Sequence, residues 1–130
     1  MEHATFNSLL RSAVDKTEFE LGSSYLEKHY QLVLAHFLRK EGATDIETEV
    51  VVPYKTSFGL HFGFGRIDIL CKYKDKLHIL ELKAGVSGLG SSRQKAILQA
   101  LRYKKHWTEP AQAHVVFFEC SAMKNIEHLS

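Results

Sequence analysis

Residues 66–84 read RIDILCKYKDKLHILELKA, two apolar segments joined by a short polar connection. The two segments, residues 66–73 and 77–83, are rich in Ile and Leu and are bounded by polar residues, which is typical of buried strands. The connection Lys74-Asp75-Lys76 has the length of a hairpin loop. This stretch therefore predicts two neighbouring antiparallel strands.

The flanking sequence predicts helices and further strands on both sides of this hairpin. Apolar side chains recur every three or four residues in segments 6–14, 24–40 and 92–107, which predicts three helices. Apolar, β-branched segments predict strands at 49–54 and 113–120. The resulting order α, α, β, β, β, α, β is typical of an α/β protein with a mixed sheet flanked by helices. The polar tail is predicted to hold at most one helical turn.

The composition is that of an ordinary globular protein, and the sequence has no sign of a membrane span or a signal peptide. With 45% hydrophobic and 25% charged residues in a chain of 130, the sequence has ordinary globular values and predicts one domain over residues 1–130. No apolar run reaches the eighteen or so residues of a membrane span, and residues 1–3 do not begin a signal peptide. The net charge of +2 neither requires nor excludes a nucleic-acid partner.

The two cysteines, Cys71 and Cys120, lie in apolar segments, and neither has metal-ligand spacing. They are expected to be reduced and buried. This usage predicts an intracellular protein, cytoplasmic or nuclear, rather than a secreted one.

Three ionisable residues interrupt the two apolar strands. Side chains two residues apart share a face of a strand, so Glu81 and Lys83 should lie together, and the hairpin can bring Asp68 opposite Glu81. Two carboxylates about 4 Å apart repel by roughly 4 kcal/mol at an effective dielectric constant of about 20. A divalent cation removes this repulsion, and oxygen ligands favour Mg²⁺ or Mn²⁺ over zinc.

Lys83 would then lie beside the metal, where its ammonium can orient a water or stabilise charge on a phosphoryl group. The ordinary alternative is an ion pair of Lys83 with Glu81 or Asp68 near a strand end. The joint occurrence of all three residues in apolar strands favours the catalytic interpretation, since buried charges are paired or bind metal.

Asp68 followed by Glu81-Leu82-Lys83 resembles the core motif of the PD-(D/E)XK nuclease superfamily, with Ile67 where the name has Pro. Residues 21–30, LGSSYLEKHY, are similar to the opening signature of one branch, the GxxExxY family, although Ser24 replaces the expected Gly. The remaining similar segments follow in that family's order: Glu47–Val50, Val52–Lys55, Arg66–Asp68 and Glu81–Ala84. Gln99-Ala100-Leu101-Arg102-Tyr103 is similar to the Q-x-x-x-Y element of exonuclease-like members.

The resemblance implies an αβββαβ restriction-endonuclease-like core and hydrolysis of phosphodiester bonds in nucleic acid, DNA in preference to RNA. It implies that Asp68, Glu81 and the backbone carbonyl of Leu82 coordinate Mg²⁺ or Mn²⁺ and that Lys83 positions the attacking water. It also implies a catalytic role for Glu27 as a helix-borne carboxylate; the alternative is a capping box in which Glu27 bonds back to the amide of Ser24.

The resemblance further implies that Gln99 and Tyr103 contact the active site or the nucleic-acid backbone; the alternative is an ordinary pair at the edge of the core. Arg102 and Lys95 belong to the most basic stretch of the chain, which would suit phosphate contacts or form a solvated helix face.

Two glycine-rich segments allow more than one interpretation. Residues 85–92 could hold a phosphate through backbone amides, although a plain connection is the simpler interpretation. Residues 56–65 include Phe58, Phe62 and Phe64, which could stack nucleobases, form a hairpin tip or provide an association surface.

The sequence thus predicts a metal-dependent nuclease. The alternative is a non-catalytic nucleic-acid-binding or scaffold module that keeps the same fold. A chain of this size without a separate DNA-reading domain would need a homodimer or a larger protein complex to engage a long substrate.

Overall fold

The computed structural model describes residues 3–85, 90–118 and 125–129, with backbone only for 90–92. The elements run in the order α1 (Phe6–Leu21), α2 (Glu27–Glu41), β1 (Thr44–Lys55), β2 (His61–Tyr73), β3 (Lys76–Ala84), α3 (Gly90–His106), β4 (Ala111–Phe118) and β5 (Ile126–Leu129). This order contains the predicted αβββαβ core and confirms an α/β fold.

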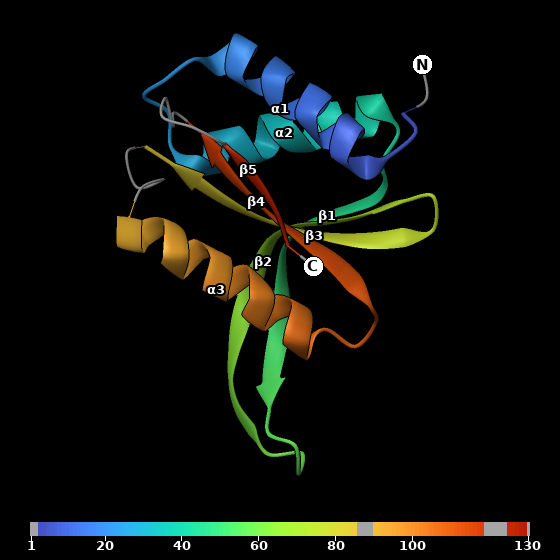
Figure 1. Ribbon diagram of the computed structural model, residues 1–130, viewed down its shortest axis with the longest axis vertical. Helices are drawn as coiled ribbons and strands as arrows, with labels where there is room; N and C mark the ends of the chain where they lie inside the picture. Colours follow the sequence, from blue (N-terminus) through green and yellow to red (C-terminus); the bar gives the residue numbers. More distant parts are fainter. Residues whose placement is uncertain (1–2, 86–89, 119–124, 130) are drawn as a thin grey trace.

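The strands form a mixed sheet in the spatial order β1-β2-β3-β4-β5. Neighbouring strands are antiparallel except β3 and β4, which are parallel and are connected through α3. Helices α1 and α2 cover one face of the sheet and α3 covers the other (Figure 1). Each face therefore has its own layer of buried apolar side chains.

Strand β5 corrects the prediction for the tail. It pairs antiparallel with β4, from Val116 opposite Ile126 to Ala113 opposite Leu129, where a helical turn was expected. Four residues are too few for a reliable strand pattern, and the pairing depends on the edge that β4 offers. The predicted strand residue Cys120 and residues 86–89 lie outside the described residues, whereas Cys71 is buried in β2 as expected.

Helix α1 extends beyond residues 6–14, the segment in which the spacing of apolar residues predicts a helix. The hydroxyl of Thr5 accepts a hydrogen bond from the amide of Ser8, and Gly22, with a φ of 64°, ends the helix. In the added turns Thr17 is buried, and its hydroxyl donates to the carbonyl of Ala13 at 2.8 Å. Within the described residues, no helix has the length and apolar character needed to cross a membrane.

The hairpin of β1 and β2 is also longer than predicted. His61–Gly65, expected in a loop, belongs to β2, and the register places Val52 opposite Gly65 and Tyr54 opposite Gly63. The hairpin projects beyond the end of α3 (Figure 1). Its turn is closed by hydrogen bonds between Thr56 and Leu60.

Strand β2 changes its orientation at Asp68. Ile67 packs in the apolar layer beneath α3, whereas Ile69 packs in the layer beneath α1 and α2. Residues two apart in a regular strand share a face, so the strand is distorted between them. Glu49, which lies between the partners of Ile67 and Ile69 on β1, has a φ of 54°.

Three histidines form a hydrogen-bonded row across β3, β4 and β5. His78 Nδ1 lies 3.0 Å from His114 Nε2, and His114 Nδ1 lies 2.8 Å from His128 Nδ1. His78 and His114 are buried, and Phe6 stacks on His78. Burial lowers the pKa of His78 to about 4 and that of His114 to about 3, so both are neutral in the native protein.

Exchange of His114 for Gln should alter how stability depends on pH. Below about pH 6.5 the unfolded chain protonates this residue while the native protein does not, so His114 destabilises the protein progressively as pH falls. Between pH 7 and pH 5 the stability of wild type relative to His114→Gln should fall by about 2 kcal/mol, measured by urea denaturation. His36→Gln, the same exchange at an exposed position of α2, is the control.

Candidate active site

Asp68 lies where the pairing of β2 with β3 ends. The last residue pair of the two strands is Ile69 opposite Leu80. Beyond it the Asp68 carboxylate replaces a backbone partner by accepting a hydrogen bond from the Leu82 amide, with Leu82 N to Asp68 Oδ2 at 2.7 Å. The distortion of β2 at this residue thus allows the side chain to reach β3.

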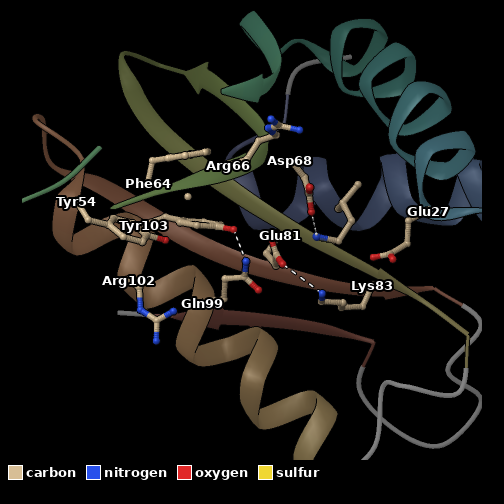
Figure 2. A pocket seen from close by; sticks show the side chains of 12 residues that line it. Glu27, Tyr54, Phe64, Arg66, Asp68, Glu81, Lys83, Gln99, Arg102 and Tyr103 are labelled. Carbon is tan, nitrogen blue, oxygen red and sulfur yellow. Dashed lines mark hydrogen bonds and ion pairs between the residues drawn. The ribbon is translucent and has the colours of Figure 1, made fainter. Parts of the chain in front are cut away.

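Glu81 and Lys83 project from the next strand toward Asp68 (Figure 2). Lys83 Nζ lies 3.6 Å from Glu81 Oε2, and the Glu81 side chain is almost completely buried. The second oxygen, Glu81 Oε1, is buried and has no hydrogen-bond partner among the described residues. The structure therefore brings together the three residues that the sequence selected.

Burial disfavours the charged form of both carboxyl groups. Burial, and after it the charge of Asp68, raises the pKa of Glu81 to about 9, and the ammonium of Lys83 offsets only part of this increase. Burial also raises the pKa of Asp68, against the stabilising hydrogen bond from Leu82. A strongly perturbed pair of this kind inside a cleft is typical of a functional site.

The donor set fits a hard divalent cation. Asp68 and Glu81 supply carboxylate oxygens, and the unpartnered Glu81 Oε1 is a buried acceptor that a cation would satisfy. Within the described ranges, no group of three His, Cys, Asp or Glu side chains is close enough to hold a metal ion by itself. The side-chain ligands would thus be the two carboxylates, with water completing the shell.

Glu27 lines the same cavity from the first turn of α2. Burial raises the pKa of Glu27, the charge of Lys83 lowers it and that of Asp68 raises it, which places this carboxylate within electrostatic reach of the pair. The alternative of a capping box that begins at Ser24 is not formed: the N-cap is Leu26, whose amide donates to Nδ1 of His29 at 3.3 Å. Glu27 is therefore not committed to capping through Ser24.

Helix α3 supplies the opposite wall of the cavity. Gln99 Nε2 donates a hydrogen bond to the hydroxyl of the buried Tyr103, whose pKa is raised to about 12 by burial and by Glu81. Arg102 is exposed and lines the cavity as well. Lys95 is exposed on α3, one turn before Gln99, and is not among the residues that line the cavity.

The cavity has a volume of about 600 Å³ and includes a wall that the sequence did not reveal. Tyr54, Phe64, Gly65 and Arg66 of the β1–β2 hairpin form this wall. The available signal was the alternation of Phe and Gly over residues 62–65, because small residues in a strand mark close approach of other groups.

Replacement of Gly65 by Ala should destabilise the protein by about 1–3 kcal/mol through overpacking. A Cβ at this position would lie 2.2 Å from the Tyr54 hydroxyl and 2.5 Å from Tyr103 Cε1. At Gly63, the matched control, the nearest atom would be at an ordinary 3.7 Å, so Gly63→Ala should keep wild-type stability. Thermal denaturation of both variants tests this; equal midpoints would show that the two rings can move aside at little cost.

A family model described as the PD-(D/E)XK nuclease superfamily matches residues 5–128. Among curated proteins, none matches the chain. The matched range includes both strands that carry Asp68, Glu81 and Lys83 as well as all three described helices. The family match does not distinguish the GxxExxY branch, which stays a prediction.

Proposed function

Because the chain belongs to the PD-(D/E)XK nuclease superfamily, we propose that residues 1–130 act as one domain that hydrolyses phosphodiester bonds, in DNA in preference to RNA. The observation that carries the proposal is the convergence of Asp68, Glu81 and Lys83 in one cavity, with a buried carboxylate oxygen that has no hydrogen-bond partner among the described residues. An ion pair that only stabilises the fold would need one carboxylate beside Lys83, whereas this cavity holds both Asp68 and Glu81.

Asp68, Glu81 and the carbonyl of Leu82 would hold Mg²⁺ or Mn²⁺, in keeping with the general use of divalent metals in this superfamily. The cation supplies charge stabilisation for a phosphoryl group and lowers the pKa of a bound water. Asp68 is already oriented by the Leu82 amide. Little rearrangement of its carboxylate is needed before the site can work.

Lys83 positions the attacking water and donates a hydrogen bond to it. Its ion pair with Glu81 aims the ammonium into the cavity and fixes its location relative to the two carboxylates. The same charge favours the extra negative charge that develops on the phosphate oxygens in the transition state. Glu27, close enough to influence both Asp68 and Lys83, can accept a hydrogen bond from a water in the cavity.

The remaining side chains of the site would hold the nucleic acid. Arg102 can pair with a backbone phosphate, and the hydrogen bond between Gln99 and Tyr103 fixes both side chains at the wall of the cavity. Lys95 would extend these phosphate contacts by one helical turn. Binding of this kind depends strongly on salt, because each phosphate contact releases counterions.

A panel of labelled linear, nicked, single-stranded and four-way substrates, as DNA and as RNA, tests the proposal. Cleavage should require Mg²⁺ or Mn²⁺ and stop on addition of EDTA. Binding without cleavage in either metal would instead support a non-catalytic module with the nuclease fold. Sedimentation of the protein with and without substrate would show whether a homodimer or a further partner is needed.

A further inference from the structure

Aromatic side chains are exposed along the β1–β2 hairpin, in addition to the residues around Asp68 and Glu81. Phe62 is 60% exposed, Phe64 is 65% exposed, and Phe58 at the tip is 80% exposed. The hairpin projects beyond the end of α3 (Figure 1), and these three phenylalanine rings are more than half exposed. An apolar surface of this kind beside a cavity indicates an interaction site.

Phe62 is linked to the active-site cavity through a cluster of three rings, Tyr54, Phe62 and His106, which we call the aromatic cluster. Ring centroids are 5.9 Å apart for Tyr54 and Phe62, 4.8 Å for Tyr54 and His106, and 5.9 Å for Phe62 and His106. The amide of Lys55 also donates to His106 Nδ1 at 3.3 Å, which joins the hairpin to α3. Tyr54 itself lines the cavity, so the aromatic cluster continues the cavity outward.

The charge around the aromatic cluster has one sign. Residues 51–66 of the hairpin contain Lys55, His61 and Arg66 and no Asp or Glu. Helix α3, which supplies His106, contains no Asp or Glu either and ends on Lys104, Lys105 and His106. The surface that leads out of the cavity therefore combines apolar rings with cations, and a polyanion with exposed aromatic faces is complementary to both.

Resting on the proposed nuclease activity, we propose that the aromatic cluster stacks the unpaired bases of a single-stranded segment next to the phosphate that is cut. Bases within a duplex present only their edges, because their faces are covered by neighbouring pairs, whereas unpaired bases offer a π-face to Phe62. The flanking cations follow the backbone of the same strand. Substrates are thus single strands, flaps or frayed ends.

A second copy of this chain is a poorer occupant of the same surface. A symmetric contact through the hairpin would bring the Lys55 side chains of both copies together with no carboxylate from residues 51–66 to compensate them, while Arg66 pairs with Glu49 of its own chain. The experiment nevertheless distinguishes self-association through Phe62 from binding of a single strand.

Fluorescence anisotropy in EDTA, where no cleavage occurs, measures binding of the full chain to a labelled single-stranded 20-mer and to the blunt duplex of the same sequence. Wild type should bind the single strand more tightly. Phe62→Ala should weaken single-strand binding about 5- to 100-fold and leave duplex binding unchanged. Phe62→Trp should retain the affinity. Phe19→Ala, which removes an 88%-exposed ring from α1, is the matched control and should behave as wild type.

Abasic nucleotides distinguish stacking from backbone contacts. Removal of bases from the 20-mer should weaken binding to wild type and have little further effect on Phe62→Ala, because both changes delete the same contact. The salt dependence of affinity should be the same for wild type and Phe62→Ala, since no phosphate contact is removed.

The stacking proposal would be overturned if Phe62→Ala bound the single strand as tightly as wild type does, or if wild type preferred the duplex. Metal-dependent cleavage by wild type would still support the nuclease in either case. A dimer that dissociates in Phe62→Ala without a change in single-strand binding would identify an association surface instead. Absence of both binding and cleavage in wild type would reject the nuclease function and the stacking proposal together.

Discussion

Replacement of Lys83 by Ala should reduce metal-dependent cleavage at least about 100- to 1,000-fold, the usual loss when one preorganised donor is removed from a transition state. The ammonium of Lys83 forms an ion pair with Glu81, and both side chains line the cavity. Binding of the nucleic acid should change much less than the cleavage rate, because the phosphate contacts proposed for α3 remain. Single-turnover cleavage and anisotropy on the same substrate separate the two quantities.

Lys76→Ala is the matched control for this variant, because Lys76 lies at the other end of the same strand and is exposed. It should cleave as wild type does. The circular dichroism of Lys83→Ala should match wild type and its thermal midpoint should stay close, since Glu81, whose pKa is already raised to about 9, can stay neutral without its partner. Cleavage that persists in Lys83→Ala would place the chemistry elsewhere or reveal a contaminating nuclease.

Exchange of Asp68 for Asn should remove activity by a similar factor and yet keep or raise the thermal midpoint in the absence of metal. The amide oxygen of Asn can still accept the hydrogen bond from the Leu82 amide, while the charge that raises the pKa of Glu81 is gone. Differential scanning fluorimetry with EDTA and with Mn²⁺ measures both effects. Wild type should be stabilised by the metal, and Asp68→Asn should show little of this stabilisation.

Asp75→Asn in the turn between β2 and β3 is the control, with the same chemical change at an exposed position. It should retain both activity and the metal-dependent stabilisation. A marked decrease in the midpoint of Asp68→Asn without metal would show that Asp68 is a structural partner of β3 and not a ligand. This outcome would leave the fold assignment intact and remove the main support for the metal site.

The candidate site divides into a part that strand periodicity predicts and a part that it does not. Glu81 and Lys83 share a face because they are two residues apart, and a three-residue polar connection predicts the hairpin that brings Asp68 beside them. The sequence did not reveal that Tyr54 and Gly65 form part of the same cavity. Gly65 is needed there because the rings of Tyr54 and Tyr103 leave no space for a Cβ.

The local predictions that were wrong have a common origin. Ser24 and Glu27 have the spacing of a capping box, yet the chain enters α2 at Leu26, and Ser24 has a φ of 75°. The tail forms β5 where a helical turn was expected because β4 provides an edge for pairing. In both cases a weak local preference did not decide the structure.

The sequence by itself determined the order of helices and strands from α1 to β4, the central hairpin and the three ionisable residues of the site, because these follow from the spacing of side chains within one segment. Tertiary structure alone decided where β2 separates from β3, how far the β1–β2 hairpin projects and which rings meet α3. These features depend on strand register, on the distortion at Asp68 and on packing between segments far apart in the sequence, such as Tyr54 and His106. No local pattern fixes such distant contacts, since they form only when the sheet and its helices come together.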